Sequence, residues 1–206
     1  MRIAQIDFDG TLVRNNIGIE LMKAYSKDLP TTLKHLKERE VFSPSQTELE
    51  EDIIEAWLLT NCSPQAEMIA ASKRLAEHFS TMPITDFLAA LEMKGYTPVI
   101  VSNGIETYIR AHIPFCYKIF ATPAIWDAPN KCWHTSPNID FKEDFTECMP
   151  VELHIGDSAE TDLLSAAITT DKDFPAFAPY ESSLFKYKGI LPIQGYSSFE
   201  DILAKL

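Results

Sequence analysis

The sequence predicts an α/β protein, with helices on both faces of a parallel sheet and a small all-helical segment inserted after the first strand. From residue 82 onward, short apolar runs of strand length alternate with amphipathic stretches of helical period, and one more apolar run opens the chain. Between them, residues 15–81 have helical periodicity and no convincing strand. Strands that alternate with helices are typical of a parallel sheet, which is covered by a helical layer on each face.

The opening apolar run, residues 2–6, is expected to form a buried strand, and Asp7-Phe8-Asp9-Gly10-Thr11 follows it directly. Both aspartates would then lie at the carboxyl end of the strand, the edge where open α/β sheets bind ligands. Two carboxylates this close repel each other and require a proton or a cation, and Mg²⁺ suits them because it prefers oxygen ligands. An ordinary Asp-Gly turn remains the alternative for this stretch taken alone.

Residues 15–81 are interpreted as a helical cap domain, and residues 1–14 and 82–206 as the core domain that carries the sheet. Apolar spacing and breaks at Pro and Ser predict four cap helices, at residues 17–25, from Thr31 or Thr32 to 40, 47–58 and 63–79. Met22 and Tyr25 in the first of them could face substrate or core, and core packing is favoured by their helical spacing.

The core domain is expected to alternate helices and strands to its end. Helices are predicted at residues 86–94, 105–112, 140–149, 163–168, 181–188 and 198–206. Strands are predicted at residues 96–101, 118–121, 151–155 and 174–178, with a further candidate at 190–194. Gly95 follows the first helix as a terminator, and residues 123–139 are compatible with a loop or a β-hairpin. Glu152 and His154 alternate with apolar neighbours and are interpreted as semi-exposed strand residues.

Two polar residues, Ser102 and Asn103, follow the predicted strand at 96–101 and precede a predicted helix. They could help to bind an anion, because free backbone N–H groups and the helix dipole point at this corner. Simple capping of the helix is the alternative, and on this stretch alone capping is favoured.

Acidic residues also follow the predicted strand at 151–155, namely Asp157 and, within the next turn, Asp162. Lys142 opens the preceding helix and could lean toward the same sheet edge, although a surface position is the default for any lysine. Lys131 competes with Lys142 for such a role.

The composition is that of an ordinary globular domain with an excess of acidic residues. Eighteen Lys and Arg against 30 Asp and Glu give a formal net charge of −12, which argues against nucleic acid or an anionic membrane as a partner. A phosphate site in this background must carry local positive charge. No apolar run approaches the roughly 18 residues of a membrane span, and Asp7 comes too early for a signal peptide.

The four cysteines lie far apart and form no Cys-x-x-Cys pair: Cys62, Cys116, Cys132 and Cys148. A disulfide framework is therefore not expected, and we interpret them as reduced thiols of a cytoplasmic protein. Cys132 and His134 flank Trp133, but two ligands at this spacing are a weak metal signal and packing is favoured.

In order along the chain, these polar stretches resemble the four signature motifs of the haloacid dehalogenase superfamily: Asp7-x-Asp9-Gly10-Thr11, Ser102-Asn103-Gly104, Lys142 and Gly156-Asp157-x4-Asp162. The resemblance covers residues 1–165 and implies a three-layer, Rossmann-like parallel sheet core with a helical type-1 cap. The chain looks most like the phosphoserine phosphatase branch, and residues 173–178 and 199–203 are similar to the ends of methylthio-ketopentenyl-phosphate phosphatases. Residues 119–139 depart from the family pattern, which leaves open whether Lys142 or Lys131 is the family lysine.

This resemblance implies a Mg²⁺-dependent phosphatase that works through an aspartyl-phosphate. Asp7 would attack phosphorus, and Asp9 would protonate the leaving alcohol and later take a proton from water. The Asp7 carboxylate, the Asp9 backbone carbonyl and Asp157 would hold the Mg²⁺.

The remaining motif residues would bind and support the phosphate. Ser102, the Asn103 N–H and Lys142 would contact it, with Lys142 supplying the positive charge that the acidic background requires. Asp162 would orient metal-bound waters or hold Lys142. Thr11, like Asp162, would support the residues that contact the metal and the phosphate.

The expected substrate is a small phosphorylated metabolite, because the cap shows no cationic cluster that would select a bisphosphate. An acid at Asp9 favours a phosphatase over a dehalogenase. A phosphotransferase with an acceptor other than water is the alternative. A catalytically silent binding or regulatory protein is disfavoured by the presence of Asp7, Asp9 and Asp157. Whether the chain is a monomer or a homodimer stays open.

Overall fold

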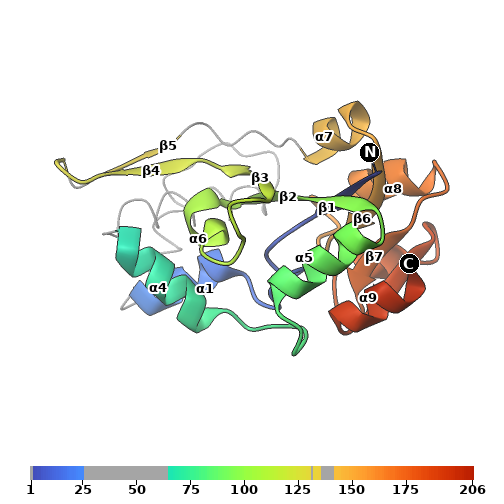
Figure 1. Cartoon of the computed structure of the whole chain (residues 1–206), viewed down its shortest axis with the longest axis horizontal. Coiled ribbons are helices and arrows are strands. Elements are labelled where there is room, and N and C mark those ends of the chain that lie inside the picture. Colours follow the sequence, from blue (N-terminus) through green and yellow to red (C-terminus); the bar gives the residue numbers. More distant parts are fainter. Residues whose placement is uncertain (1, 26–64, 131, 136–141) are drawn as a thin grey trace, which may run out of the picture.

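The computed structural model describes residues 2–25, 65–130, 132–135 and 142–206, and a six-stranded parallel sheet lies at its centre (Figure 1). The strand order is β3-β2-β1-β6-β7-β8. The bounds are β1 Arg2–Ile6, β2 Tyr96–Ile105, β3 Lys118–Thr122, β6 Val151–Ile155, β7 Ala176–Pro179 and β8 Ile193–Tyr196. The first strand of the chain is thus central in the sheet, between β2 and β6, so the residues that follow it lie in the middle of the sheet edge.

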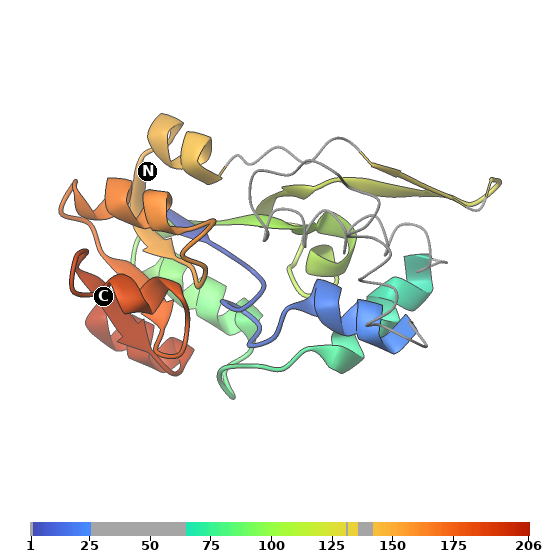
Figure 2. The same cartoon turned by 180° about the vertical axis from the view of Figure 1, so that it is seen from behind.

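Helices cover both faces of this sheet (Figures 1 and 2). The described helices are α1 Ile17–Tyr25, α4 Gln65–Leu75, α5 Ile84–Met93, α6 Glu106–Arg110, α7 Lys142–Cys148, α8 Leu163–Thr170, the 3₁₀ helix η1 Leu184–Tyr187 and α9 Phe199–Lys205. α5 packs against α9 on one face, and α7 packs against α8 on the other. The α/β class with a Rossmann-like parallel sheet, predicted from the sequence, is confirmed.

The alternation of side chains along β1 assigns each residue to one of these two faces. Ala4 and Ile6 belong to the larger apolar cluster, which α5 and α9 cover, whereas Ile3 packs in a second cluster with Phe145 of α7. Successive strand side chains point to opposite faces, so Gln5 lies on the α7 face with Ile3. Asp7, two residues further on, continues along that face.

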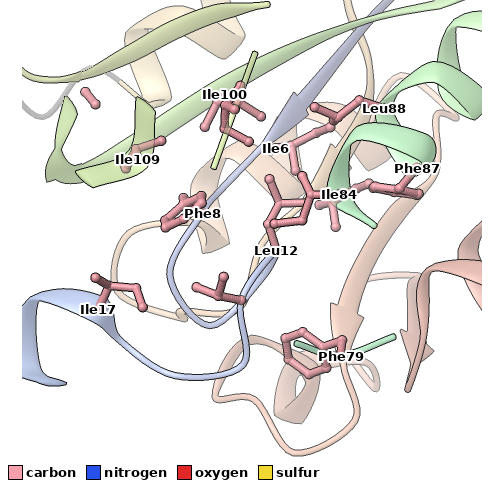
Figure 3. Packing of buried hydrophobic residues seen from close by; sticks show 14 of the residues in the cluster. Ile6, Phe8, Leu12, Ile17, Phe79, Ile84, Phe87, Leu88, Ile100 and Ile109 are labelled. Carbon is pink, nitrogen blue, oxygen red and sulfur yellow. The ribbon is translucent and has the colours of Figure 1, made fainter. Parts of the chain in front are cut away.

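The loop after β1 is anchored in the larger cluster (Figure 3). Ile6, Phe8 and Leu12 all point into it and are fully buried. The Phe8 ring lies 6.2 Å from the ring of Tyr108 and 5.4 Å from that of His112, centroid to centroid. Because Phe8 is buried, the residues on either side of it cannot move independently of the core.

Within residues 15–81, the described parts contain two helices, α1 and α4, where the sequence predicts the first and the fourth. α1 packs against α4, and Leu21, Met22, Met68 and Ala71 are buried in the larger cluster. The core packing favoured for Met22 is therefore confirmed, whereas the side chain of Tyr25 lies outside the described residues, as do the predicted helices at 31–40 and 47–58.

α4 ends at Leu75, although its helical pattern predicts residues up to 79. The Asn15 side chain causes the difference: its amide donates to the Leu75 carbonyl and its oxygen accepts from the Glu77 N–H, both at 2.9 Å. The Arg14 N–H also donates to the Glu77 carbonyl at 2.7 Å. Residues 76–78 are thus held extended beside residues 13–15, an interaction between distant segments that overrides local helix propensity.

β2 is longer than predicted and α6 is shorter. β2 runs to Ile105 with a register shift against β3, where the sequence predicts a strand end at residue 101. The Thr122 hydroxyl donates to the Asn103 carbonyl at 3.0 Å, which keeps this stretch extended. α6 consequently begins at Glu106.

Residues 123–139 contain a β-hairpin, the second of the two alternatives, with β4 Ala124–Asp127 paired antiparallel to β5 Cys132–Thr135. Near the C-terminus, the helix predicted at 181–188 is only the short η1, and the last strand begins at Ile193 rather than 190. Pro192 lacks a backbone N–H, which fits a strand that starts directly after it.

None of the helices within the described ranges is long and apolar enough to span a bilayer. Cys116 and Cys148 are exposed free thiols, as predicted, and Cys62 lies outside the described residues.

Phe199→Ala should lower the free energy of unfolding by about 3–5 kcal/mol, because it removes a fully buried ring. This ring stacks on Phe87 of α5 at 4.4 Å and 14° and so joins α9 to α5. Urea unfolding followed by circular dichroism measures the change. Met93→Ala is the control, since Met93 is 84% exposed and its loss should cost less than about 0.5 kcal/mol. Similar losses in the two variants would contradict this account of the core.

Candidate active site

Asp7 and Asp9 lie at the carboxyl end of β1, as the sequence predicts. The Asp7 N–H still donates to the Ile155 carbonyl of β6 at 2.9 Å, so the sheet ladder holds its backbone. Gly10 then turns the chain with φ +70°, and a Cβ at this position would collide with the Asp157 carboxylate. The turn therefore packs closely against Asp157, which follows β6. Any other residue at position 10 would have a strained backbone and a side chain that does not fit.

Lys142, the first residue of α7, extends into the same site. Its ammonium lies 3.2 Å from Asp7 Oδ2 and 3.1 Å from Asp162 Oδ1, and it donates to the Thr161 hydroxyl at 3.2 Å. The side chain is 2% exposed. Burial disfavours the charged form, but the carboxylates of Asp162 and Asp7 outweigh it and raise the pKa of Lys142. The lysine is therefore a fixed positive charge at neutral pH.

A buried polar network holds the backbone of Lys142 from behind. The Lys142 carbonyl oxygen lies within hydrogen-bond distance of Gln5 Nε2 at 3.2 Å, Thr146 Oγ1 at 2.7 Å and Ser165 Oγ at 3.1 Å. Thr146 also contacts Gln5 Oε1 and the Ser165 hydroxyl, at 2.6 and 2.9 Å. The sequence analysis missed this network. A glutamine inside an apolar strand, two residues before Asp7, was the signal that could have suggested it.

Asp157 and Asp162 follow β6 and differ in how fully their oxygens are used. Asp162 is fully buried, with Oδ1 on Lys142 and Oδ2 accepting from the Ser158 N–H at 3.2 Å and facing the Thr161 hydroxyl at 3.4 Å. Asp157 accepts a long hydrogen bond from the Thr11 hydroxyl, 3.4 Å to Oδ1. Of the two roles considered for Asp162, support of Lys142 is the one its contacts favour.

The acidic groups outnumber the lysine. Carboxylate oxygens of Asp7, Asp157 and Asp162 lie within 4.8 Å of one another. Burial raises the pKa of Asp7 despite the Lys142 ammonium, and burial together with the charges of Asp7 and Asp162 raises the pKa of Asp157 well above its usual range. Ionised carboxylates in such a cluster need a further cation.

A hard divalent cation fits the donors that remain. Among the described residues, Asp7 Oδ1 is buried with no hydrogen-bond partner, and carboxylate oxygens of Asp7 and Asp157 lie within 4.8 Å of each other. Both offer oxygen, the ligand type that Mg²⁺ prefers. Because both oxygens of Asp162 already have partners, Asp7 and Asp157 are the carboxylates suited to a metal. Their role as its ligands stays a prediction.

Asp9 is not part of this cluster, and each of its carboxylate oxygens has a partner. Oδ1 accepts from the Ile17 N–H at 2.8 Å, and Oδ2 accepts from the Tyr108 hydroxyl at 2.7 Å. Tyr108 is a site residue that the sequence analysis missed. An amphipathic aromatic in the helix directly after Ser-Asn-Gly was the available signal.

Ser102 and Asn103 lie in the last part of β2, just beyond Ile100, which pairs with Ile6 of β1. Ser102 is buried and its hydroxyl accepts from the Gly104 N–H at 3.3 Å. The N-cap position of α6 is Ile105, with no side-chain cap, so the alternative in which Ser102 and Asn103 cap the next helix is wrong. A Cβ on Gly104 would collide with the Tyr108 hydroxyl and come within 2.9 Å of Asp9 Oδ2.

A pocket of about 270 Å³ opens over these residues. Its described lining includes Asp7, Asp9, Ser102, Asn103, Lys142 and Asp157. The structure thus brings together the residues predicted for catalysis, phosphate binding and metal binding, while Asp162 and Thr11 lie behind them. The lining also includes Asn16 and Gly18 at the start of α1, and four residues to which the sequence assigns no role: Arg14, Tyr108, Ser158 and Thr161.

His154 lies beneath the site and is fully buried, so its interpretation as a semi-exposed strand residue is wrong. Its Nε2 is 3.6 Å from Asp162 Oδ1. Burial lowers the pKa of His154 to about 4, which keeps the ring neutral. Glu152 is partly exposed, as predicted, and pairs with Arg2 at 2.7 Å.

Two other candidates from the sequence remain, Lys131 and the pair Cys132 and His134. Lys131 is outside the described residues, so the choice between it and Lys142 rests on the contacts of Lys142 alone. His134 is exposed and its Nε2 lies 3.3 Å from Asp127 Oδ2. This contact gives no support to a metal site with Cys132, whose side chain is outside the described part of the chain.

Solved structures with the same fold are phosphatases and hydrolases. A phosphoserine phosphatase in the form of a phospho-aspartyl intermediate analogue matches with a TM-score of 0.68 and 17% identity, over 100% of this chain and 98% of that chain. The apo form of a phosphoserine phosphatase matches with a TM-score of 0.66 and 17% identity, over 98% of each chain. A HAD family hydrolase from Salmonella enterica serovar Typhi matches with a TM-score of 0.67 and 15% identity, over 98% of this chain and 70% of that chain.

No protein-family model matches the sequence, and a search of curated proteins gives no match. At these identities, the likeness to solved structures establishes the fold. The fold is that of the haloacid dehalogenase (HAD) type, in the form found in phosphoserine phosphatases. This confirms the Rossmann-like parallel sheet core that the resemblance implied, and the helical cap stays a prediction.

Mg²⁺ should raise the melting temperature of the protein, because it binds the folded carboxylate cluster and not the unfolded chain. Asp157→Asn should remove most of this increase. In EDTA the variant should be at least as stable as the wild type, since one buried charge fewer relieves repulsion. Thermal unfolding in EDTA and in excess Mg²⁺ measures both effects.

The control for this experiment is Glu67→Gln, which removes an exposed carboxylate of α4. It should leave the Mg²⁺ effect intact. An equal Mg²⁺-induced shift in Asp157→Asn and the wild type would contradict the metal site.

Proposed function

We propose that this protein is a Mg²⁺-dependent phosphatase of small phosphomonoesters, and that it works through an aspartyl-phosphate on Asp7. The observation that carries the proposal is the asymmetry of the Asp7 carboxylate. Lys142 binds Oδ2 at 3.2 Å, whereas Oδ1 is buried and has no hydrogen-bond partner within the part of the chain that the structure describes. A nucleophile held by a cation on one oxygen is fixed in direction, which is what in-line phosphoryl transfer requires.

The phosphate of the substrate would lie between the ends of β1, β2 and α7. Ser102 and the Asn103 N–H would donate to its oxygens from one side and Lys142 from the other. All three residues line the same pocket as Asp7. Phosphoryl transfer is catalysed mainly by positioning and by charge stabilisation, so a fixed lysine in a chain of net charge −12 fits this role.

Asp7 and Asp157, with the Asp9 backbone carbonyl, are the groups that we propose for Mg²⁺. The metal would neutralise charge on the phosphate oxygens and screen the repulsion between phosphate and carboxylates. Asp162 and Thr11 would act indirectly, Asp162 by holding Lys142 and Thr11 by contacting the Asp157 carboxylate at 3.4 Å.

Asp9 would act on the leaving group. In the first step the P–O bond to the alcohol breaks, the oxygen takes the Asp9 proton, and phosphorus bonds to Asp7. In the second step water attacks phosphorus, gives its proton to Asp9 and releases phosphate and free Asp7. The acid on the leaving-group side supports a phosphatase over a dehalogenase, because an alkoxide leaves poorly without a proton.

The pocket suggests a small substrate. About 270 Å³ holds the phosphate and a compact leaving group. We propose that residues 15–81 form a cap over this pocket and residues 1–14 and 82–206 the core. α1 and α4 support the division, since they pack together beside the pocket, and Gly18 of α1 belongs to its lining.

Asp7→Asn should abolish turnover while the fold is retained, because the amide has nearly the same shape but is not a nucleophile for phosphorus. The experiment follows phosphate release from a panel of small phosphomonoesters with Mg²⁺ and with EDTA, and circular dichroism checks the fold. Substantial residual release by the variant would exclude the aspartyl-phosphate mechanism. Labelling of Asp7 without phosphate release would instead indicate a phosphotransferase.

Lys142→Ala should lower turnover by at least about 10²-fold, the usual effect of losing one donor to a developing oxyanion. Lys131→Ala is the matched comparison and should retain near-normal turnover. Steady-state rates of the two variants, with the melting temperature of each, measure the contrast. Collapse of activity in Lys131→Ala with normal activity in Lys142→Ala would reverse the assignment of the phosphate-binding lysine.

A further inference from the structure

The Asp9 side chain is held from two directions by groups that belong to different parts of the fold. The Ile17 N–H at the start of α1 donates to Oδ1 at 2.8 Å, and the Tyr108 hydroxyl of α6 donates to Oδ2 at 2.7 Å. The first donor is backbone and is fixed by the helix. The second is a side chain, and it is the one that a substitution can remove without moving the chain.

Tyr108 is itself rigidly placed. It is 2% exposed, and its ring lies 6.2 Å from that of Phe8, the residue between Asp7 and Asp9. Its hydroxyl reaches Asp9 over Gly104, where a Cβ would occupy the same space. Burial and the Asp9 charge raise the pKa of Tyr108 well above its usual range, so the hydroxyl keeps its proton and remains a donor.

Proton transfer depends on this placement. An acid must lie within hydrogen-bond reach of the oxygen that it protonates, and a small displacement costs much of its effect. Asp9 follows the last strand residue by three positions and lies in a turn, so the sheet ladder does not fix its side chain. The two hydrogen bonds supply that restraint.

We propose that Tyr108 is a positioning residue that holds Asp9 for proton transfer to the leaving-group oxygen. The inference rests on the proposed function. It concerns the step in which the P–O bond to the alcohol breaks, the electron pair stays on the alcohol oxygen and the Asp9 proton moves to that oxygen. The hydroxyl of Tyr108 acts through Asp9 and exchanges no atom with the substrate.

This role predicts an effect that depends on the leaving group. Nitrophenolate is a stable anion and leaves without help, whereas an alkoxide needs the proton. Two substrates of similar size separate the cases: 4-nitrobenzyl phosphate, an alkyl ester, and 4-nitrophenyl phosphate, an aryl ester. The measured quantity is kcat/KM, because it reports on the steps up to release of the alcohol and not on the later hydrolysis.

Tyr108→Phe removes the hydroxyl and keeps the ring. We expect kcat/KM for the alkyl ester to fall at least about tenfold more than for the aryl ester, a fraction of the 10²–10⁴ that a positioned acid contributes. Adding Tyr108→Phe to Asp9→Asn should change the alkyl rate little further, because both variants remove the same function. Tyr117→Phe is the control, since its hydroxyl contacts Glu92 at 3.2 Å outside the pocket lining.

Equal losses for the two esters, or additive losses in the double variant, would overturn the proposal and leave Tyr108 a structural residue. An unchanged alkyl rate in Tyr108→Phe would overturn it too. A wild-type protein that hydrolyses neither ester would overturn the proposed function, and the role of Tyr108 with it. Activity in the wild type therefore separates failure of the inference from failure of the function.

Discussion

The buried ammonium of Lys142, paired with Asp7 and Asp162, is the interaction on which the rest of the site depends. It joins the ends of β1, α7 and the loop after β6 at 3.2 and 3.1 Å. Buried charges are costly unless they are paired and hydrogen-bonded, so the surrounding fold has to hold them. Three carboxylates against one lysine leave an excess of negative charge, and this imbalance is the physical reason to expect a divalent cation.

The parallel sheet provides the support that this cluster needs. β1 directs Ala4 and Ile6 toward the α5 face and Gln5 and Asp7 toward the α7 face, so one strand supplies both an apolar core and a polar site. Gln5, Thr146 and Ser165 converge on the carbonyl of Lys142 and fix the start of α7. A network of this kind is favourable only when its members are all satisfied, and the hydrogen bonds among these three meet that condition.

The leaving-group side is built differently. Asp9 lies in a turn, and its two oxygens are bound by α1 and by α6. α1 is also part of the segment inserted after β1, and its Gly18 lines the pocket. The hydrogen bond from the Ile17 N–H therefore links the position of the Asp9 carboxylate to this segment. In the proposed mechanism, these hydrogen bonds would couple substrate recognition to proton transfer.

The sequence by itself determined the α/β class, most of the core elements and the residues that meet at the sheet edge. The spacing of its apolar residues indicates which segments are helices or strands and which of their faces are buried. Residues at the carboxyl ends of adjacent parallel strands lie at the same edge of the sheet and must come together. Tertiary structure alone decided the early end of α4 at the Asn15 side chain, the extension of β2 through Asn103, and the burial of His154. It also decided the contacts of Gln5 and Tyr108 with the site. These features depend on partners 19 to 160 residues away, or on a helix packed from another segment, and no local pattern encodes such contacts.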